Sequence, residues 1–168
     1  MSWWIWFPTG FKDMVNQWAN LGGITENWGP SDDSYIYQTT WRFMVTSSGS
    51  IIILHRELDT SSHGHSSGQY VQNYYEEWVH LQLYARFSTN GTGIYRAWFN
   101  NNLFIEETNL TNDPAAVLQP GETKVNGDAP TMEVQLYTET DNNEIWFYVD
   151  DIVAATEKVQ ETYEVHDE

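Results

Sequence analysis

Apolar and polar residues alternate strictly between residues 78 and 87. The odd-numbered positions are all apolar: Val79, Leu81, Leu83, Ala85 and Phe87. The even-numbered positions carry aromatic or hydrogen-bonding side chains: Trp78, His80, Gln82, Tyr84 and Arg86. Because side chains along a strand point alternately to its two faces, this pattern predicts a strand with one face in a core. The other face offers rings and donors, where a solvated face usually carries Lys, Glu, Thr and Ser.

Similar strand-like runs recur along the chain, with turn signals between them. We expect strands over residues 2–7, 35–46, 50–58, 94–100, 103–108, 131–138 and 144–154. Tight turns predict hairpins between 35–46 and 50–58 and between 94–100 and 103–108, and the last two runs are expected to pair with each other. Val79, Leu81, Leu83 and Phe87 should lie buried between two sheets.

One short helix is predicted within residues 11–21, ended by Gly22 and Gly23. Polar loops are expected over residues 24–34, 59–68 and 109–130. Many short strands with almost no helix predict an all-β antiparallel sandwich or barrel. We expect one domain over residues 1–155 and an exposed acidic tail over residues 156–168.

The charge balance limits the partners of the chain. Seven basic residues against 24 acidic ones give a net charge of −17, which disfavours binding to nucleic acid or to anionic membranes.

The chain has no cysteine, so disulfides and thiolate metal sites are excluded. Neither a signal-peptide pattern nor an apolar run of membrane-spanning length is visible.

Aromatic residues are unusually frequent, with nine Trp and ten Tyr in 168 residues. One small core cannot readily hide so many rings, so some are expected at a binding surface or a subunit interface. The alternative interpretation is that they are simply large strand residues on half-buried surfaces.

Three segments carry a resemblance to a known superfamily. They are WVHLQLYARF at residues 78–87, GIYRAWFNNN at 93–102 and FYVDDI at 147–152. Together with the aromatic run at residues 2–7, they resemble the concanavalin A-like lectin and glucanase superfamily. That superfamily includes laminin-G-like lectins and the heparin-lyase-like and alginate-lyase-like polysaccharide lyases. The resemblance implies a two-sheet jelly roll, a fold that hosts binding proteins and enzymes alike.

The resemblance also implies a gap at the start of the chain. Members of the superfamily usually have a strand before the one that residues 2–7 resemble, and that strand pairs with the closing strand. We therefore expect residues 2–7 to lack their usual partner and to be covered by another chain, the acidic tail or an unexpected strand. Self-association through this edge is one predicted partner interaction.

The polar face of residues 78–87 is the predicted site. For a glycan, Trp78 or Tyr84 would provide the stacking surface, and His80, Gln82 and Arg86 would contact hydroxyl or carboxylate groups. Three residues of neighbouring strands are expected nearby: Arg42, His55 and Tyr137.

Two enzymatic alternatives use acid–base groups. If the protein is a polysaccharide lyase acting by β-elimination on a uronic-acid polymer, His80, Gln82, Tyr84 and Arg86 would be catalytic. However, residues 80–82 read His-Leu-Gln, the reverse of the Gln-x-His order of related lyases, and their Tyr-x-Lys motif is absent. A glucanase is disfavoured, because the adjacent acidic pairs at 76–77 and 106–107 should face opposite sides of a strand.

Two segments of the sequence carry residues that could bind a metal ion. Asp150 and Asp151 match the superfamily's closing "DDi", where an Asp often binds calcium or a backbone amide, so a structural Ca²⁺ is one prediction and a turn cap is its alternative. His63 and His65 would lie on the same side of an extended segment, a geometry that zinc could use, but the sequence shows no third ligand nearby.

The preferred functional prediction is a non-enzymatic, lectin-like module that binds glycans or mediates adhesion. We expect it on an extracellular, cell-surface or virion assembly, where neighbouring chains would cover rings and sheet edges. The lyase is the alternative.

Overall fold

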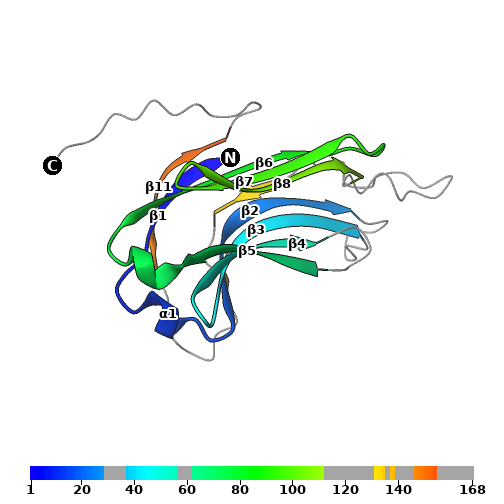
Figure 1. Ribbon diagram of the computed structural model, residues 1–168. Helices are drawn as coiled ribbons and strands as arrows, with labels where there is room; N and C mark the ends of the chain where they lie inside the picture. Colours follow the sequence, from blue (N-terminus) through cyan, green and yellow to red (C-terminus); the bar gives the residue numbers. More distant parts are fainter. Residues whose placement is uncertain (29–36, 57–61, 112–130, 135–136, 139–145, 155–168) are drawn as a thin grey trace.

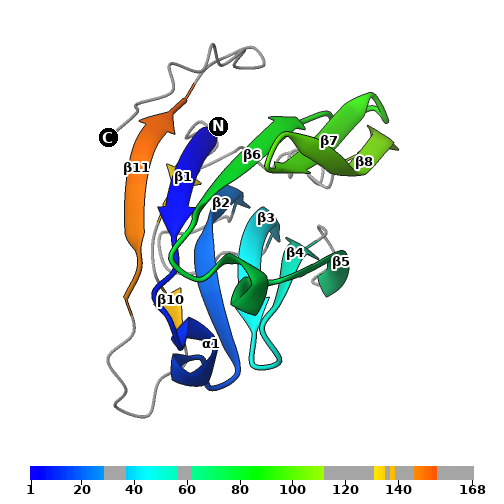
Figure 2. The same cartoon turned by 60° about the vertical axis from the view of Figure 1, so that its left-hand side comes forward.

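The computed structural model describes residues 1–28, 37–56, 62–111, 131–134, 137–138 and 146–154. These residues form a jelly-roll sandwich of two antiparallel sheets, which confirms the predicted fold class (Figures 1 and 2). No helix among them is long and apolar enough to cross a membrane. The predicted acidic tail lies outside the described residues.

The first sheet has five strands in the order β11-β1-β6-β7-β8. Their bounds are Ser2–Trp6 for β1, Trp78–Arg86 for β6, Gly93–Phe99 for β7, Asn102–Leu110 for β8 and Tyr148–Val153 for β11. The second sheet has the order β10-β2-β3-β4-β5, and β9 also pairs with β2. Its strands are Trp18–Trp28 (β2), Tyr37–Thr46 (β3), Ser50–Arg56 (β4), Ser62–Tyr70 (β5), Thr131–Glu133 (β9) and Tyr137–Thr138 (β10).

The core is built from the inward positions of both sheets. Val79, Leu81 and Leu83 are buried as predicted, whereas Phe87 is only half-buried because it lies beyond the end of β6. From the opposite sheet, Trp41, Phe43 and Val45 alternate inward along β3. Burial of this many large apolar side chains provides the main driving force for folding.

Both predicted hairpins are confirmed. Strands β3 and β4 pair in antiparallel register, as do β7 and β8. At the β7–β8 turn, Asn100 and Asn101 both have positive φ angles, 47° and 63°. Two left-handed residues are what a two-residue type I′ hairpin requires, and Asn adopts this conformation more readily than most residues.

The predicted helix is mostly wrong. Helix α1 covers only Phe11–Met14, and the chain is already extended at Val15. From Trp18 it forms β2, which pairs with ten residues of β3 and continues through residues 24–28, where a loop was expected. The apolar spacing of Phe11, Val15 and Trp18 fits a helix, but pairing with β3 determines the outcome because local propensity is a weak constraint.

The predicted loop at residues 59–68 is also corrected in part, since β5 begins at Ser62 and pairs with β4. Its Ser, His and Gly residues give no strand signal, yet the sheet supplies the backbone partners. A short 3₁₀ helix, η1, follows at Val71–Tyr74.

The C-terminal hairpin prediction is wrong. Strands β9 and β10 pair with β2 in one sheet, whereas β11 pairs with β1 in the other. Residues 2–7 are thus covered by a strand that was not expected there, β11, which is one of the three coverings predicted for this edge. Strand β1 lies between β6 and β11, so its backbone groups are used on both sides and offer no edge for self-association (Figure 2).

Substitution of Gly23 tests the close packing between β2 and β3. A Cβ atom at this position would collide with the carbonyl oxygen of Trp41 and lie 2.8 Å from Cα of Arg42. Because both neighbours are backbone atoms, we expect Gly23→Ala to lower the free energy of unfolding by about 1–3 kcal/mol.

Gly64→Ala in β5 is the matched control, since its Cβ would meet only Cδ1 of Ile52, at an ordinary 3.6 Å. Its effect should stay within about 0.5 kcal/mol in urea unfolding. Equal stability of the two variants would contradict the described β2–β3 packing.

Candidate functional site

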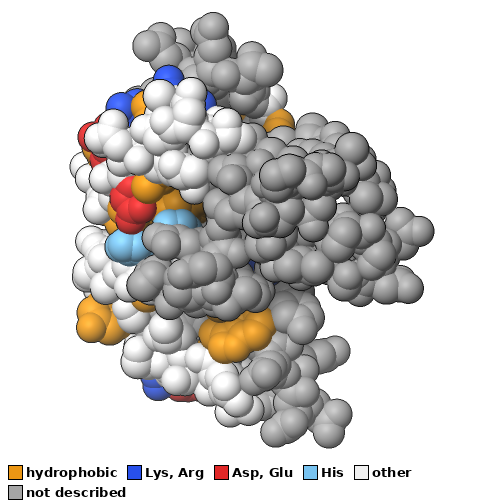
Figure 3. Space-filling model, turned by 90° about the vertical axis from the view of Figure 1, so that its right-hand side faces the viewer, with side chains coloured by type: hydrophobic (Ala, Val, Ile, Leu, Met, Phe, Trp, Pro, Cys, Tyr) orange, Lys and Arg blue, Asp and Glu red, His pale blue; other side chains and the backbone are white. Residues whose placement is uncertain are grey.

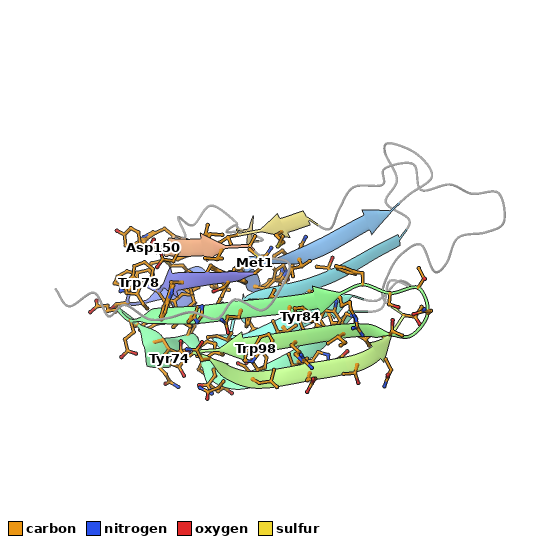
Figure 4. The ribbon with its side chains drawn as sticks, turned by 90° about the horizontal axis from the view of Figure 1, so that it is seen from above. Met1, Tyr74, Trp78, Tyr84, Trp98 and Asp150 are labelled. Carbon is orange, nitrogen blue, oxygen red and sulfur yellow. The ribbon has the colours of Figure 1, made fainter. Side chains whose placement is uncertain are left out.

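The outward positions of the five-stranded sheet form rows across β11, β1 and β6. One row contains Tyr148, Trp6 and Trp78, which are Cα partners in register. We call these three residues the aromatic row. Adjacent strands are about 4.8 Å apart, so the three side chains are neighbours on one side of the sheet; Trp78 is labelled in Figure 4.

The aromatic row is open to solvent among the described residues. Trp78 is 44% exposed and Tyr148 is 57% exposed, while Trp6 is half-buried between them. The ring centroids of Trp6 and Tyr148 lie 5.3 Å apart, and Trp146 extends the group at 5.4 Å from Tyr148. Ring contacts at these separations are favourable, so the surface is preformed.

His80 occupies the next row but is completely buried, although the predicted site was expected to lie on an exposed or concave face. Its Nε2 lies 2.6 Å from Oγ of Ser2, and its Nδ1 lies 3.1 Å from Oδ1 of Asn101. The indole of Trp4 stacks on the imidazole with centroids 4.7 Å apart. His80 therefore joins β1, β6 and the β7–β8 turn as a structural residue.

The remaining predicted residues of β6 differ in exposure. Gln82 is buried, Tyr84 is half-buried and Arg86 is exposed, with its guanidinium donating to the carbonyl oxygen of Thr92. Tyr84 and Trp98 point outward on this sheet, as Figure 4 shows. The middle of the predicted face is thus covered, and its exposed residues are those at the two ends of β6, Trp78 and Arg86.

The structure does not bring Arg42, His55 and Tyr137 to this face, because all three belong to the six-stranded sheet. Arg42 alternates with the inward-facing Trp41 and Phe43, so it points away from the core on the far side of the molecule. Tyr137 pairs with Asn20 of β2. His55 points inward, where its ring stacks on Trp41 at 3.4 Å between centroids.

Asp150 and Asp151 lie on the exposed edge strand β11. The backbone N–H of Asp151 donates to Oδ1 of Asp150 at 2.8 Å, and Asp151 has a φ of 47° at an irregularity in the β1–β11 pairing. This is the turn-capping geometry that was the alternative to calcium. Among the described residues, neither Asp belongs to a group of three converging ligands, and a calcium ion here stays a prediction.

A second group of polar side chains lies between the sheets. His55 of β4 and His65 of β5 face Glu107 of β8, and one potential ligand atom of each lies within 4.8 Å of the others. Nε2 of His65 is 3.2 Å from Oε1 of Glu107, and Nδ1 of His55 is 3.8 Å from its Oε2. Figure 3 shows acidic and histidine side chains next to one another on one face of the molecule.

Tyr95 lies against this group. It is completely buried, it pairs with Glu107 across β7 and β8, and its ring stacks on Trp41 at 3.5 Å. Burial, and secondarily the charge of Glu107, raise the pKa of the Tyr95 phenol well above its ordinary value. Its hydroxyl has no hydrogen-bond partner among the described residues.

Sequence reasoning missed Glu107, Tyr95 and two members of the aromatic row, Trp6 and Tyr148. Glu107 could have been found from the opposite facing of Glu106 and Glu107, which the structure confirms: Glu106 bonds outward to Arg96 while Glu107 points inward. Convergence with His55 and His65 depends on contact between the sheets, for which sequence pattern carries no signal.

Comparisons with known proteins give weak matches only. No family model and no curated protein matches the chain. Among solved structures, alginate lyase vAL-1 from Chlorella virus shares 15% identity at a TM-score of 0.48, covering 67% of this chain and 54% of that one. The endo-β-1,4-glucuronan lyase from the fungus Trichoderma reesei shares 12% identity at a TM-score of 0.46, and the match covers 67% of this chain and 49% of that one. The chain thus spans about half the length of the solved structures it matches, and likenesses at this level assign it no activity.

The Ser2–His80 contact yields a stability prediction. We expect Ser2→Ala and His80→Ala each to lower the free energy of unfolding, because each leaves a buried polar partner without one of its contacts. A double-mutant cycle measured by urea unfolding should give a coupling of about 0.5–1.5 kcal/mol. A coupling near zero would show that the two side chains do not interact.

Proposed function

We propose that the protein is a non-enzymatic carbohydrate-binding module and that its binding surface is the aromatic row with Trp146. The observation that carries this proposal is the alignment of Tyr148, Trp6 and Trp78 in one register across three strands. Flat, partly exposed rings on a rigid sheet provide apolar area at little entropic cost, which suits stacking on the apolar faces of sugar rings.

Polar groups beside the aromatic row suit hydroxyl recognition. Asp150 is exposed in the row next to Tyr148, and Glu76 and Glu77 are exposed just before Trp78. Carboxylates accept hydrogen bonds from hydroxyl groups and form stronger bonds than neutral acceptors. A ring platform flanked by acceptors fits a polyhydroxylated ligand.

The charges favour a neutral glycan over a uronic-acid polymer. The groups flanking the aromatic row are acidic, and the net charge of the chain is −17, so a polyanion would be repelled. The nearest described arginines on this sheet are already engaged: Arg86 with the carbonyl of Thr92, and Arg96 with Glu106.

The lyase alternative lacks its base among the described residues of this face. Both ring nitrogens of His80 contact protein atoms, and the ring is sealed under Trp4. A general base must reach the substrate proton within hydrogen-bonding distance.

We also propose an extracellular, cell-surface or virion setting for the protein, and this part of the proposal rests on composition alone.

The proposal predicts loss of binding on truncation of the aromatic row. In a screen of neutral and uronic-acid glycans followed by calorimetry, we expect neutral oligosaccharides to bind. Trp78→Ala should weaken binding at least about tenfold, as expected for one buried aromatic contact, while the melting temperature changes little because the side chain is 44% exposed.

Leu103→Ala is the control, since Leu103 is 48% exposed in β8 of the same sheet but distant from the aromatic row in strand order. It should bind like the original protein. An absorbance assay for unsaturated products on alginate and glucuronan, run in parallel, tests the alternative. Product formation that His80→Ala abolishes without unfolding the protein would replace the binding proposal with a lyase.

A further inference from the structure

We propose that His55, His65 and Glu107 form a zinc-binding site between the two sheets. This site is separate from the proposed glycan surface, because its ligands point inward from β4, β5 and β8, whereas the aromatic row lies outward on β11, β1 and β6. Neither proposal depends on the other.

The distances match a metal site that needs only slight closing. Zinc holds nitrogen and oxygen ligands at about 2.0–2.1 Å in a tetrahedron, so neighbouring ligand atoms should be about 3.3 Å apart. Nε2 of His65 lies 3.2 Å from Oε1 of Glu107 and Nδ1 of His55 lies 3.8 Å from its Oε2, and one potential ligand atom of each residue lies within 4.8 Å of the others. The His65–Glu107 contact lacks the alignment of a hydrogen bond, since Nε2 of His65 has no hydrogen-bond partner despite its proximity.

The donor set selects the metal. Two imidazoles and one carboxylate suit zinc and similar first-row transition ions, whereas calcium and magnesium require more oxygen ligands. The site lies near the surface: side-chain exposure is 37% for His65 and 25% for Glu107, against 4% for His55. Nε2 of His65 is itself buried, so an ion would enter past the exposed parts of the His65 and Glu107 side chains.

Tyr95 provides an independent indication of a ligand at this position. Its hydroxyl is completely buried beside Glu107 and has no partner among the described residues. In folded proteins such groups are normally satisfied by a protein atom, an ordered water or a bound ion. With three protein ligands, zinc keeps a fourth position for water, and a metal-bound water is the kind of partner that this hydroxyl lacks.

Zinc at this site would link the sheets directly. His55 and His65 come from the six-stranded sheet and Glu107 from the five-stranded sheet. Because the ligands converge only in the folded protein, binding should raise the melting temperature in proportion to the logarithm of the zinc concentration.

The test uses full-length protein stripped with a chelator and titrated with ZnCl₂ by calorimetry. We expect one equivalent of Zn²⁺ to bind, with Ca²⁺ and Mg²⁺ inert, and Co²⁺ to give the visible absorption of a four-coordinate site. Glu107→Gln and His65→Gln should each weaken zinc binding more than 100-fold, exceeding the roughly 10–100-fold losses typical of outer-shell partners.

Glu106→Gln is the matched control, since it changes the same group on the adjacent, outward-facing residue and should bind zinc normally. Equal weakening by Glu106→Gln, equal binding by His65→Gln, or no stoichiometric binding by the unsubstituted protein would overturn the proposal. Should Glu107→Gln fail to fold, as judged by circular dichroism, the accessible His65→Gln variant decides.

Discussion

Contact between the two inner faces through Trp41 is the interaction on which the group of His55, His65 and Glu107 depends. Trp41 lies on β3 of one sheet and stacks on Tyr95 of the other, while its neighbour in register, His55, stacks on it as well. The stack sets where β7 and β8 lie relative to β4, and so it brings Glu107 opposite His55. In a close-packed interior such a contact tolerates little displacement, because losing it would leave a cavity the size of an indole.

Strand β1 has the corresponding role on the outer face. Its inward residues Trp3, Ile5 and Phe7 fill the core, while Trp4 and Trp6 point outward. Because β11 and β6 pair with β1 on its two sides, each outward indole has a neighbour on both strands. One of them, Trp4, is used to cover His80, and the other, Trp6, is the centre of the aromatic row. An aromatic-rich strand in the interior of a sheet thus serves stability and recognition together.

The sequence predicted features that depend on period-two alternation and on turn chemistry. The facing of Val79 and His80, the opposite facing of Glu106 and Glu107, and the Asn100–Asn101 turn all follow from local rules. Prediction from the sequence failed where the pairing partner is distant in the chain. Strand β5 has a loop-like composition, residues 11–18 have helical spacing, and β11 pairs with β1 across most of the chain length. Alternation also assigns a face without telling whether that face is covered, which is why the burial of His80 could not be predicted from it.

The burial of His80 changes what its chemistry means. A histidine beside Gln, Tyr and Arg on one strand face has the composition of an acid–base site. To act as a base, however, its imidazole needs a nitrogen that can reach the substrate, and composition does not show whether it has one. Here the imidazole is held by Ser2, Asn101 and Trp4, and a side chain fixed from three elements contributes rigidity. The histidines better placed to bind a ligand are His55 and His65, because both lie close to the Glu107 carboxylate at a partly buried position between the sheets. In this sandwich the candidate metal ligands therefore lie on the inner faces, and the partly exposed rings of the aromatic row lie on the outer face of the five-stranded sheet.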